Sequence, residues 1–306
     1  MVFRSRVPHQ SAGLALVEYL ARRFTYHAPD EWRRLVAAGR VTVNGVQVAP
    51  DTAVGPGDEV AYTPEPFEEP PADLSFEVVY EDQWFLAVNK PGDLLVHRAG
   101  RSFTHNLVYQ VRAGTRTPAF PRAAASNRLD RETSGLVIVA KDSSYCGALA
   151  TALRGADAHK EYLAVVHGGR QLEPGLIEVP VGRDPGSPMH YRHAVLREGG
   201  KDAVTRVVEV HPLGARHALL RLEAVTGRTH QLRLHCAHVG CPIVGDRLYG
   251  AGDGDERGTS GLIARHALHC ARMRFRHPST GSSIELVAPL PADFRALVAA
   301  LRDQDG

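Results

Sequence analysis

The sequence predicts an α+β fold with a mixed, mostly antiparallel sheet, preceded by a small separate domain. Segments rich in β-branched or alternating apolar residues predict strands, namely 76–80, 85–88, 135–140, 162–166, 204–210 and 218–224. Apolar residues at helical spacing predict only a few helices among them, at 143–153, 229–239 and 294–301. Because strands follow one another without regular alternation with helices, the pattern favours α+β over a parallel α/β sheet.

The first 62 residues form a pattern of their own. Leu16, Leu20 and Phe24 recur at helical spacing, and a second short helix around Trp32 ends at Gly39. The pair Asn44-Gly45 in segment 41–48 predicts a hairpin with a type I′ turn, and segment 54–60 reads as a turn and a closing strand. Four prolines and three acids in 63–71 predict an extended linker. We therefore expect a domain at 1–62, a linker at 63–73 and a second domain at 74–306.

Composition sets limits on the class of protein. Of 306 residues, 43% are hydrophobic and 23% are charged, which fits a soluble globular chain of roughly two domains. There is no apolar stretch of about eighteen residues, and Met1 to Arg6 lacks the apolar run of a signal peptide, so we expect a cytoplasmic protein without a membrane partner. Four irregularly spaced cysteines fit a reducing compartment. Nothing in the sequence requires more than a monomer.

The balance of charge leaves the partners open. The net charge is only +2, so composition alone does not indicate nucleic-acid binding. Thirty-two of the 36 basic residues are arginine, which suits phosphate contacts and base stacking but is also typical of a GC-rich genome.

The segment from Ser126 to Lys141 is the most informative. It places Asp130 between Arg128 and Arg131 in a polar loop that runs directly into a buried apolar strand. Functional side chains are often held at the rim of such a rigid element. An ordinary turn closed by Gly135 is the alternative when this segment is considered by itself.

Four segments, in order, resemble the RluA-type family of RNA pseudouridine synthases. Arg128-Leu129-Asp130, followed two residues later by Thr133-Ser134-Gly135, resembles the family signature. The others are Asn89-Lys90-Pro91 within 88–97, Lys160-Glu161-Tyr162, and Gly227-Arg228-Thr229-His230-Gln231 with the glycine-rich turn at 240–246. The resemblance covers residues 74 to 300. One departure is Asn127, which stands where the family usually has His, and this puts only a supporting contact in doubt.

The resemblance implies an isomerase that converts uridine to pseudouridine and needs no cofactor and no metal. It makes Asp130 the catalytic carboxylate, acting as a nucleophile or as a base, and Arg228 the guanidinium beside it. Tyr162 would stack on the uracil and relay a proton, and Arg128 would fill the gap left by the extruded base. Further substrate-binding residues implied by the same motifs are Lys90, His97 and Arg233. Ordinary structural roles remain open for three of these residues: a helix cap for Arg228, a core position for Tyr162 and a phosphate contact for Arg128.

Residues 10 to 62 resemble the alpha-L RNA-binding module of some ribosomal proteins and RNA-modifying enzymes. The segment 38–45 and the later Gly57-Asp58 carry this resemblance. It implies phosphate contacts from four helical arginines, Arg22, Arg23, Arg33 and Arg34. A capping subdomain with ordinary solvated helix faces is the alternative.

Several competing functions remain open. Ribosomal RNA of the large subunit is favoured as the substrate over transfer RNA because the N-terminal module is commonest among ribosomal RNA enzymes. Potential metal ligands at His235, Cys236, His238 and Cys241 keep a zinc hydrolase open. A non-catalytic RNA-binding protein is disfavoured by the intact Asp130. A glycosidase is disfavoured because such enzymes usually use two carboxylates and only one is marked here.

Overall fold

The computed structural model describes residues 2–302, except 25–26, 66–67, 190 and 251–262. The chain divides into two compact units, Met1–Pro70 and Pro71–Gly306. The division falls inside the expected linker at 63–73. Each unit has its own cluster of buried apolar side chains.

The first unit is built from two helices and a small antiparallel sheet in the order β1-β4-β2-β3. Its elements are β1 (Phe3–Arg6), a 3-10 turn (His9–Ser11), α1 (Leu16–Arg23), α2 (Pro29–Ala37), β2 (Val41–Val43), β3 (Val46–Gln47) and β4 (Glu59–Tyr62). Asn44 and Gly45 adopt φ values of 51° and 81°, as the predicted type I′ turn requires. The core forms around fully buried Trp32 and Tyr19. The predicted helices and hairpin are therefore correct, whereas strand β1 was not predicted.

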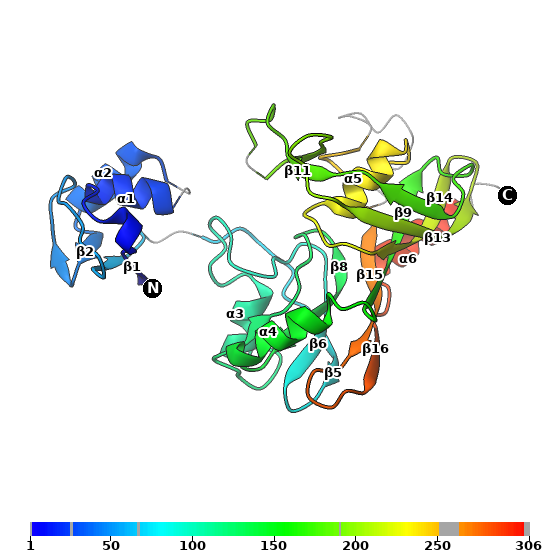
Figure 1. The fold of residues 1–306 in the computed structure, drawn as a ribbon, viewed down its shortest axis with the longest axis horizontal. Helices are drawn as coiled ribbons and strands as arrows, with labels where there is room; N and C mark the ends of the chain where they lie inside the picture. Colours follow the sequence, from blue (N-terminus) through cyan, green and yellow to red (C-terminus); the bar gives the residue numbers. More distant parts are fainter. Residues whose placement is uncertain (1, 25–26, 66–67, 190, 251–262, 303–306) are drawn as a thin grey trace. The chain divides into compact units, whose positions relative to one another are not determined.

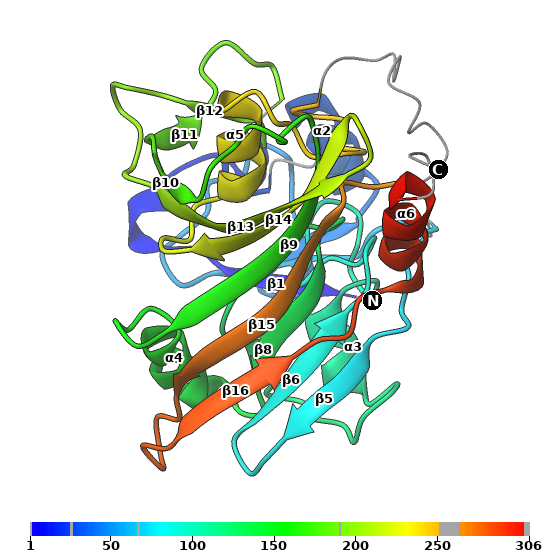
Figure 2. The same cartoon turned by 90° about the vertical axis from the view of Figure 1, so that its right-hand side faces the viewer.

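The second unit is built on one ten-stranded sheet, with order β10-β13-β14-β9-β15-β8-β6-β5, to which β16 and β7 add at β15 and β8. Every pairing in it is antiparallel except β15 with β8. Figure 2 shows these strands side by side from β13 to β5. The strands are β5 (Glu77–Glu81), β6 (Phe85–Lys90), β7 (Ala124–Ala125), β8 (Ser134–Ala140), β9 (His159–His167), β10 (Gly175–Glu178), β13 (Val204–Leu213), β14 (His217–Ala224), β15 (Leu268–Arg276) and β16 (Ser283–Val287). The mixed, mostly antiparallel α+β fold is confirmed.

Helices and a hairpin surround this sheet. They are α3 (Leu107–Ala113), α4 (Ser143–Ala152), α5 (Gln231–His238), α6 (Ala292–Arg302) and the separate hairpin β11 (Val181–Arg183) with β12 (His193–Val195). Helices α3 and α4 lie on the same side of β6 and β8 (Figure 1). All seven residues of β8 are buried, so the loop before it enters a rigid core strand. No helix in the described part of the chain is both long and apolar enough to cross a bilayer.

Candidate active site

Asp130 lies in the loop before β8 and lines a pocket of about 130 Å³. Its side chain is 18% exposed, so the carboxylate is accessible but partly desolvated. The pocket wall comes from the Asp130 loop, from Tyr162 on β9, from the end of β14 and from the start of α5. Among the described residues that line this pocket, Asp130 is the only acid.

The Thr133-Ser134-Gly135 motif fastens the Asp130 loop to strand β15 and to the residues just before that strand. The Thr133 hydroxyl lies 2.7 Å from Nε2 of His266, and the Ser134 hydroxyl lies 2.9 Å from Nδ1 of His269. Gly135 has φ of 110°, and a Cβ added there would come within 2.2 Å of the Cys270 carbonyl oxygen. Only glycine permits this backbone approach. The motif therefore positions Asp130 through its neighbours.

Lys90 holds the same loop from the opposite direction. Its side chain is fully buried, and Nζ donates to the carbonyl oxygens of Pro91, Leu94 and Arg131 at 2.7, 2.9 and 3.1 Å. Burial lowers the pKa of Lys90 to about 7. The expectation that Lys90 binds substrate is wrong, because its donors are all occupied within the protein and it does not line the Asp130 pocket.

Replacing Lys90 should mainly destabilise the fold. We expect Lys90→Met to lower the free energy of unfolding by about 2–4 kcal/mol, because three carbonyls near the Asp130 loop lose their donor. Denaturant unfolding measures this change. Lys160→Met is the matched control, since Lys160 bonds one carbonyl, that of Leu153. An equal loss in both variants would show that the three carbonyls find other donors.

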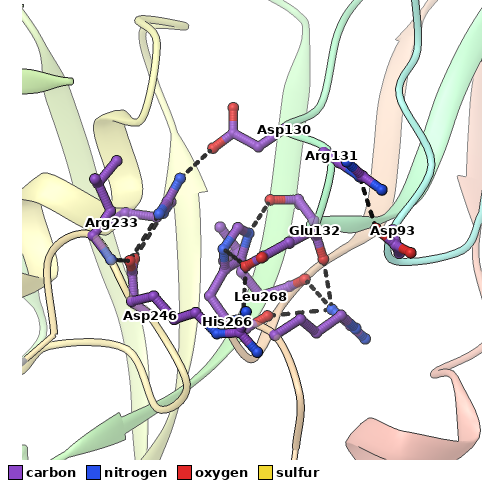
Figure 3. A network of polar contacts seen from close by, with 12 residues as sticks. Asp93, Asp130, Arg131, Glu132, Arg233, Asp246, His266 and Leu268 are labelled. Atoms are coloured by element: carbon purple, nitrogen blue, oxygen red, sulfur yellow. Dashed lines mark hydrogen bonds and ion pairs between the residues drawn. The ribbon is translucent and has the colours of Figure 1, made fainter. Parts of the chain in front are cut away.

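Arg233 on α5 is the guanidinium beside Asp130. Its Nη1 donates to Oδ2 of Asp130 at 3.1 Å, while Nε and Nη2 donate to the two oxygens of Asp246 at 2.7 Å each (Figure 3). Burial opposes the charge of Arg233, but its bonds to Asp246 and Asp130 outweigh burial and raise its pKa. Burial likewise acts against the Asp246 carboxylate, yet Arg233 holds the pKa of Asp246 below its usual value. One fixed cation thus serves both carboxylates.

The predicted pairing of Arg228 with Asp130 is wrong. Arg228 precedes α5, is exposed, and donates from Nε to the Asp202 carbonyl oxygen at 2.9 Å. It still lines the pocket. The two arginines are five residues apart, and the helix directs the second of them, Arg233, towards Asp130. Arg233, expected only to bind substrate, occupies the place expected for Arg228.

Tyr162 lies in the pocket wall opposite Cys270 in the β9–β15 register. Burial, followed by the neighbouring Cys270 thiol, raises the pKa of its hydroxyl well above the usual value. The hydroxyl therefore stays protonated at neutral pH. A proton relay through Tyr162 would therefore start from the neutral hydroxyl.

Of the remaining residues singled out in the catalytic domain, Arg128 lines the Asp130 pocket, whereas His97 and Asn127 do not. Arg128 is exposed and lines the pocket, and no described residue accepts a hydrogen bond from its guanidinium. His97 does not line this pocket, and although the residue is largely exposed, desolvation of its ring, followed by the charge of Arg128, lowers its pKa. Asn127 bonds β8 through both ends of its amide, to the Leu136 carbonyl and the Ile138 amide. It is thus an anchor of the loop.

The four arginines predicted to bind phosphate in the first unit lie on α1 and α2. Three form ion pairs: Arg22 with Glu18, Arg33 with Asp51, and Arg34 with both Glu31 and Glu65. The fourth, Arg23, lies over the ring of Phe24. These ion pairs are exposed, and exposed ion pairs contribute little to the stability of the fold.

The suspected zinc ligands on α5 and at Cys241, three residues beyond its end, do not converge. No group of three histidine, cysteine or acidic side chains suited to a metal occurs in the part of the chain that the structure describes. Nε2 of His235 is 3.1 Å from the Val179 carbonyl oxygen, and Cys236 is buried in the apolar core. The spacing of these ligands along the helix therefore does not bring them together.

Comparison with known proteins agrees with this fold. The family model of RNA pseudouridylate synthases matches residues 84–238. Ribosomal large subunit pseudouridine synthase D of Neisseria meningitidis is 34% identical over 98% of this chain and 82% of its own length. The enzyme of the same name from Escherichia coli K12 is 33% identical over 97% of this chain and 93% of its own length.

Solved structures give the same result. Human RNA Pseudouridylate Synthase Domain Containing 1 is 28% identical and covers 77% of this chain and 98% of its own, with a TM-score of 0.58. These matches define an enzyme that modifies RNA by isomerisation. The chain belongs to the RNA pseudouridylate synthase family.

Proposed function

We propose that this enzyme converts uridine to pseudouridine in large-subunit ribosomal RNA, with Asp130 as the catalytic carboxylate and without a cofactor. The observation that carries the proposal is that Asp130 is the one acid among the described residues lining the pocket and is held by a buried arginine. The names of the relatives favour ribosomal RNA over transfer RNA.

The chemistry suits a single carboxylate. The reaction breaks the bond between ribose C1′ and uracil N1, turns the base, and forms a bond from C1′ to uracil C5. C5 releases its proton when it bonds to C1′ and N1 takes up a proton, so the atoms balance and the oxidation state does not change. Asp130 acts either as a nucleophile or as the base of an elimination route. Arg233, fixed by Asp246, donates a hydrogen bond to Asp130 and orients its carboxylate.

Tyr162 and Arg128 complete the proposed site. We expect Tyr162→Phe to lower kcat by about tenfold or more with little change in the Kd for RNA, because the ring face remains and only the proton-relaying hydroxyl is lost. Tritium release from RNA labelled at uracil C5 measures the rate, and filter binding measures Kd. Equal losses in both would mean that the hydroxyl anchors RNA. Arg128 lines the pocket and is exposed, and we propose that its side chain replaces the extruded base.

The substrate is tested in cells. Pseudouridines are mapped in ribosomal and transfer RNA from cells with the gene, without it, and with the Asp130→Asn variant in its place. Sites that disappear from large-subunit ribosomal RNA in both altered strains support the proposal. Loss confined to transfer RNA would overturn the choice of substrate, and no loss at all would overturn the function.

The first unit is proposed to bind RNA, and its own core allows it to be removed cleanly. A chain of residues 71–306 should fold and retain the chemistry on short RNA, yet bind its full target more weakly. Residues 1–62 carry seven arginines against six acids, so any contribution depends on how the basic residues cluster. The slope of log Kd against log salt should flatten by about one for each phosphate that this unit neutralises in the full chain. If the salt dependence and the affinity are the same with and without this unit, the unit does not bind RNA.

A further inference from the structure

His230 lies beside Asp130, and the sequence motifs gave it no role of its own. It immediately precedes α5 with φ of 57°, a left-handed conformation that places its ring in the pocket wall. The side chain is 11% exposed, and Nε2 lies 3.8 Å from Oδ2 of Asp130. This distance is too long for a hydrogen bond. No described residue accepts a hydrogen bond from Nε2.

The other ring nitrogen is held by Tyr249. Nδ1 of His230 is 2.7 Å from the Tyr249 hydroxyl, and the backbone N–H of His193, at the start of β12, donates to the same oxygen at 2.9 Å. A backbone N–H can only donate, so the hydroxyl oxygen accepts from His193 and its own proton is available for Nδ1. With the opposite tautomer, two N–H groups would point at one oxygen and the hydroxyl proton would have no described acceptor.

The contacts of Tyr249 therefore favour the tautomer of His230 with its proton on Nε2, the nitrogen nearer to Asp130. Burial lowers the pKa of His230 to about 4, so the ring is neutral at neutral pH. A neutral donor does not compete with Arg233 for the negative charge of Asp130. Arg233 in turn lies under the Tyr249 ring, 5.0 Å from its centre, so Asp130, Arg233, Tyr249 and His230 form one connected group.

We propose that His230 is a further catalytic residue, whose Nε2–H donates to the C2 carbonyl oxygen of the target uracil, and that Tyr249 positions it. When the C1′–N1 bond breaks, its electron pair enters the uracil ring and is shared by N1 and the carbonyl oxygens. The C2 oxygen is attached next to N1, and Asp130 acts near this bond in the proposed function, on which this inference rests. A fixed donor aimed at developing negative charge stabilises the transition state.

The tautomer is tested on the free enzyme by nitrogen spectroscopy. In protein labelled with ¹⁵N-histidine, long-range proton–nitrogen correlations distinguish the two neutral tautomers, and the signals absent from His230→Gln belong to His230. We expect the Nε2-protonated form in the wild type and a mixture in Tyr249→Phe. A ring protonated at Nδ1 would overturn the inference and leave the role of Asp130 intact.

The contact with substrate is tested by a matched pair of variants. His230→Gln keeps an N–H donor near the position of Nε2, whereas His230→Leu removes it, and both place a side chain in the same left-handed conformation. We expect kcat to fall about tenfold or more in His230→Leu and less than about threefold in His230→Gln, with similar Kd for RNA. Equal losses in both variants would overturn the inference.

A modified substrate identifies the acceptor atom. In RNA made with 2-thiouridine, sulfur replaces the C2 oxygen and accepts hydrogen bonds weakly. The wild type should slow on this RNA, and His230→Leu should show no further loss beyond its loss on normal RNA. Fully additive losses would exclude the C2 oxygen as the partner. Activity of Asp130→Asn near the wild-type level would instead contradict the proposed function, whatever the His230 tautomer.

Discussion

Asp130→Asn should abolish pseudouridine formation while RNA binding persists. The variant keeps the size of the side chain and a hydrogen-bond acceptor for Nη1 of Arg233, but it removes the carboxylate that the chemistry needs. Loss of an essential catalytic group of this kind lowers kcat by at least about 10⁴-fold. Tritium release from RNA labelled at uracil C5 measures the rate, and filter binding measures the affinity.

Two controls make this result specific. Thermal unfolding should be nearly unchanged, because Asp130 is only partly buried and Arg233 retains both bonds to Asp246. Asp93→Asn is a matched substitution in the same region, since Asp93 pairs with Arg131, the residue after Asp130, without lining the pocket. It should keep most of the activity. A kcat of Asp130→Asn within tenfold of the wild-type kcat would show that Asp130 is not the catalytic carboxylate.

Arg233→Lys should have the second-largest effect and should reduce both stability and rate. Lysine keeps the charge but cannot make the two parallel bonds to Asp246 and the third bond to Asp130. The Asp246 side chain is 1% exposed, so imperfect pairing leaves a buried carboxylate poorly satisfied. We expect the free energy of unfolding to fall by about 2–4 kcal/mol and kcat to fall about 100-fold.

The same substitution at Arg228 is the control. Arg228→Lys lies in the same pocket but loses only one exposed bond to a carbonyl, so it should change stability by less than about 0.5 kcal/mol. Its kcat should fall by less than tenfold. If Arg228→Lys is the more damaging of the two, the pairing of Arg233 with Asp130 is not the one used in catalysis.

The pH dependence of stability gives an independent check on Arg233. The pKa of Asp246 is lowered in the folded chain, so the unfolded chain binds more protons as the solution is acidified. The stabilisation by this carboxylate is present above its unfolded pKa of about 3.9 and is lost as the pH falls through the lower folded value. The difference in unfolding free energy between wild type and Arg233→Lys should therefore be largest near neutral pH and shrink below about pH 4.

The sequence predicted the fold class and the Asp130 loop well, because both depend on local patterns. Buried strand β8 reads as a continuous apolar run, and the turn at Asn44-Gly45 follows from the φ angles these residues tolerate. The motif resemblance assigned the pairing with Asp130 to Arg228, whereas the structure gives it to Arg233, because both arginines stand in one motif near the start of α5 and only the folded helix shows which one faces Asp130. The sequence did carry one signal for Arg233: this arginine stands between two leucines, Leu232 and Leu234, and an acid that could pair with it follows at Asp246.

Other misses come from patterns that depend on tertiary packing. Strand β15 alternates buried apolar residues with arginines but contains His269 and Cys270 near its start, which local preferences do not assign to a strand. Helix α3 spans seven residues, too few to show a clear period, although Asn106 caps it. Lys90 was expected to bind substrate only because it stands in one of the motifs that carry the family resemblance. Lys90 is buried because its ammonium group contacts the carbonyl oxygens of Leu94 and Arg131, and Arg131 lies 41 residues further along the chain, so local sequence patterns do not show this contact.

The anchoring of the signature motif on β15 also sets the order in which the enzyme becomes competent during synthesis. The hydroxyl of Thr133 pairs with a histidine 133 positions later in the chain, and that of Ser134 with one 135 positions later. Chains emerge from the ribosome from the N-terminus, and contacts between distant segments form last. A nascent chain that ends before residue 266 lacks both of these anchors for the Asp130 loop. Modification of RNA therefore begins only after most of the catalytic domain has been made.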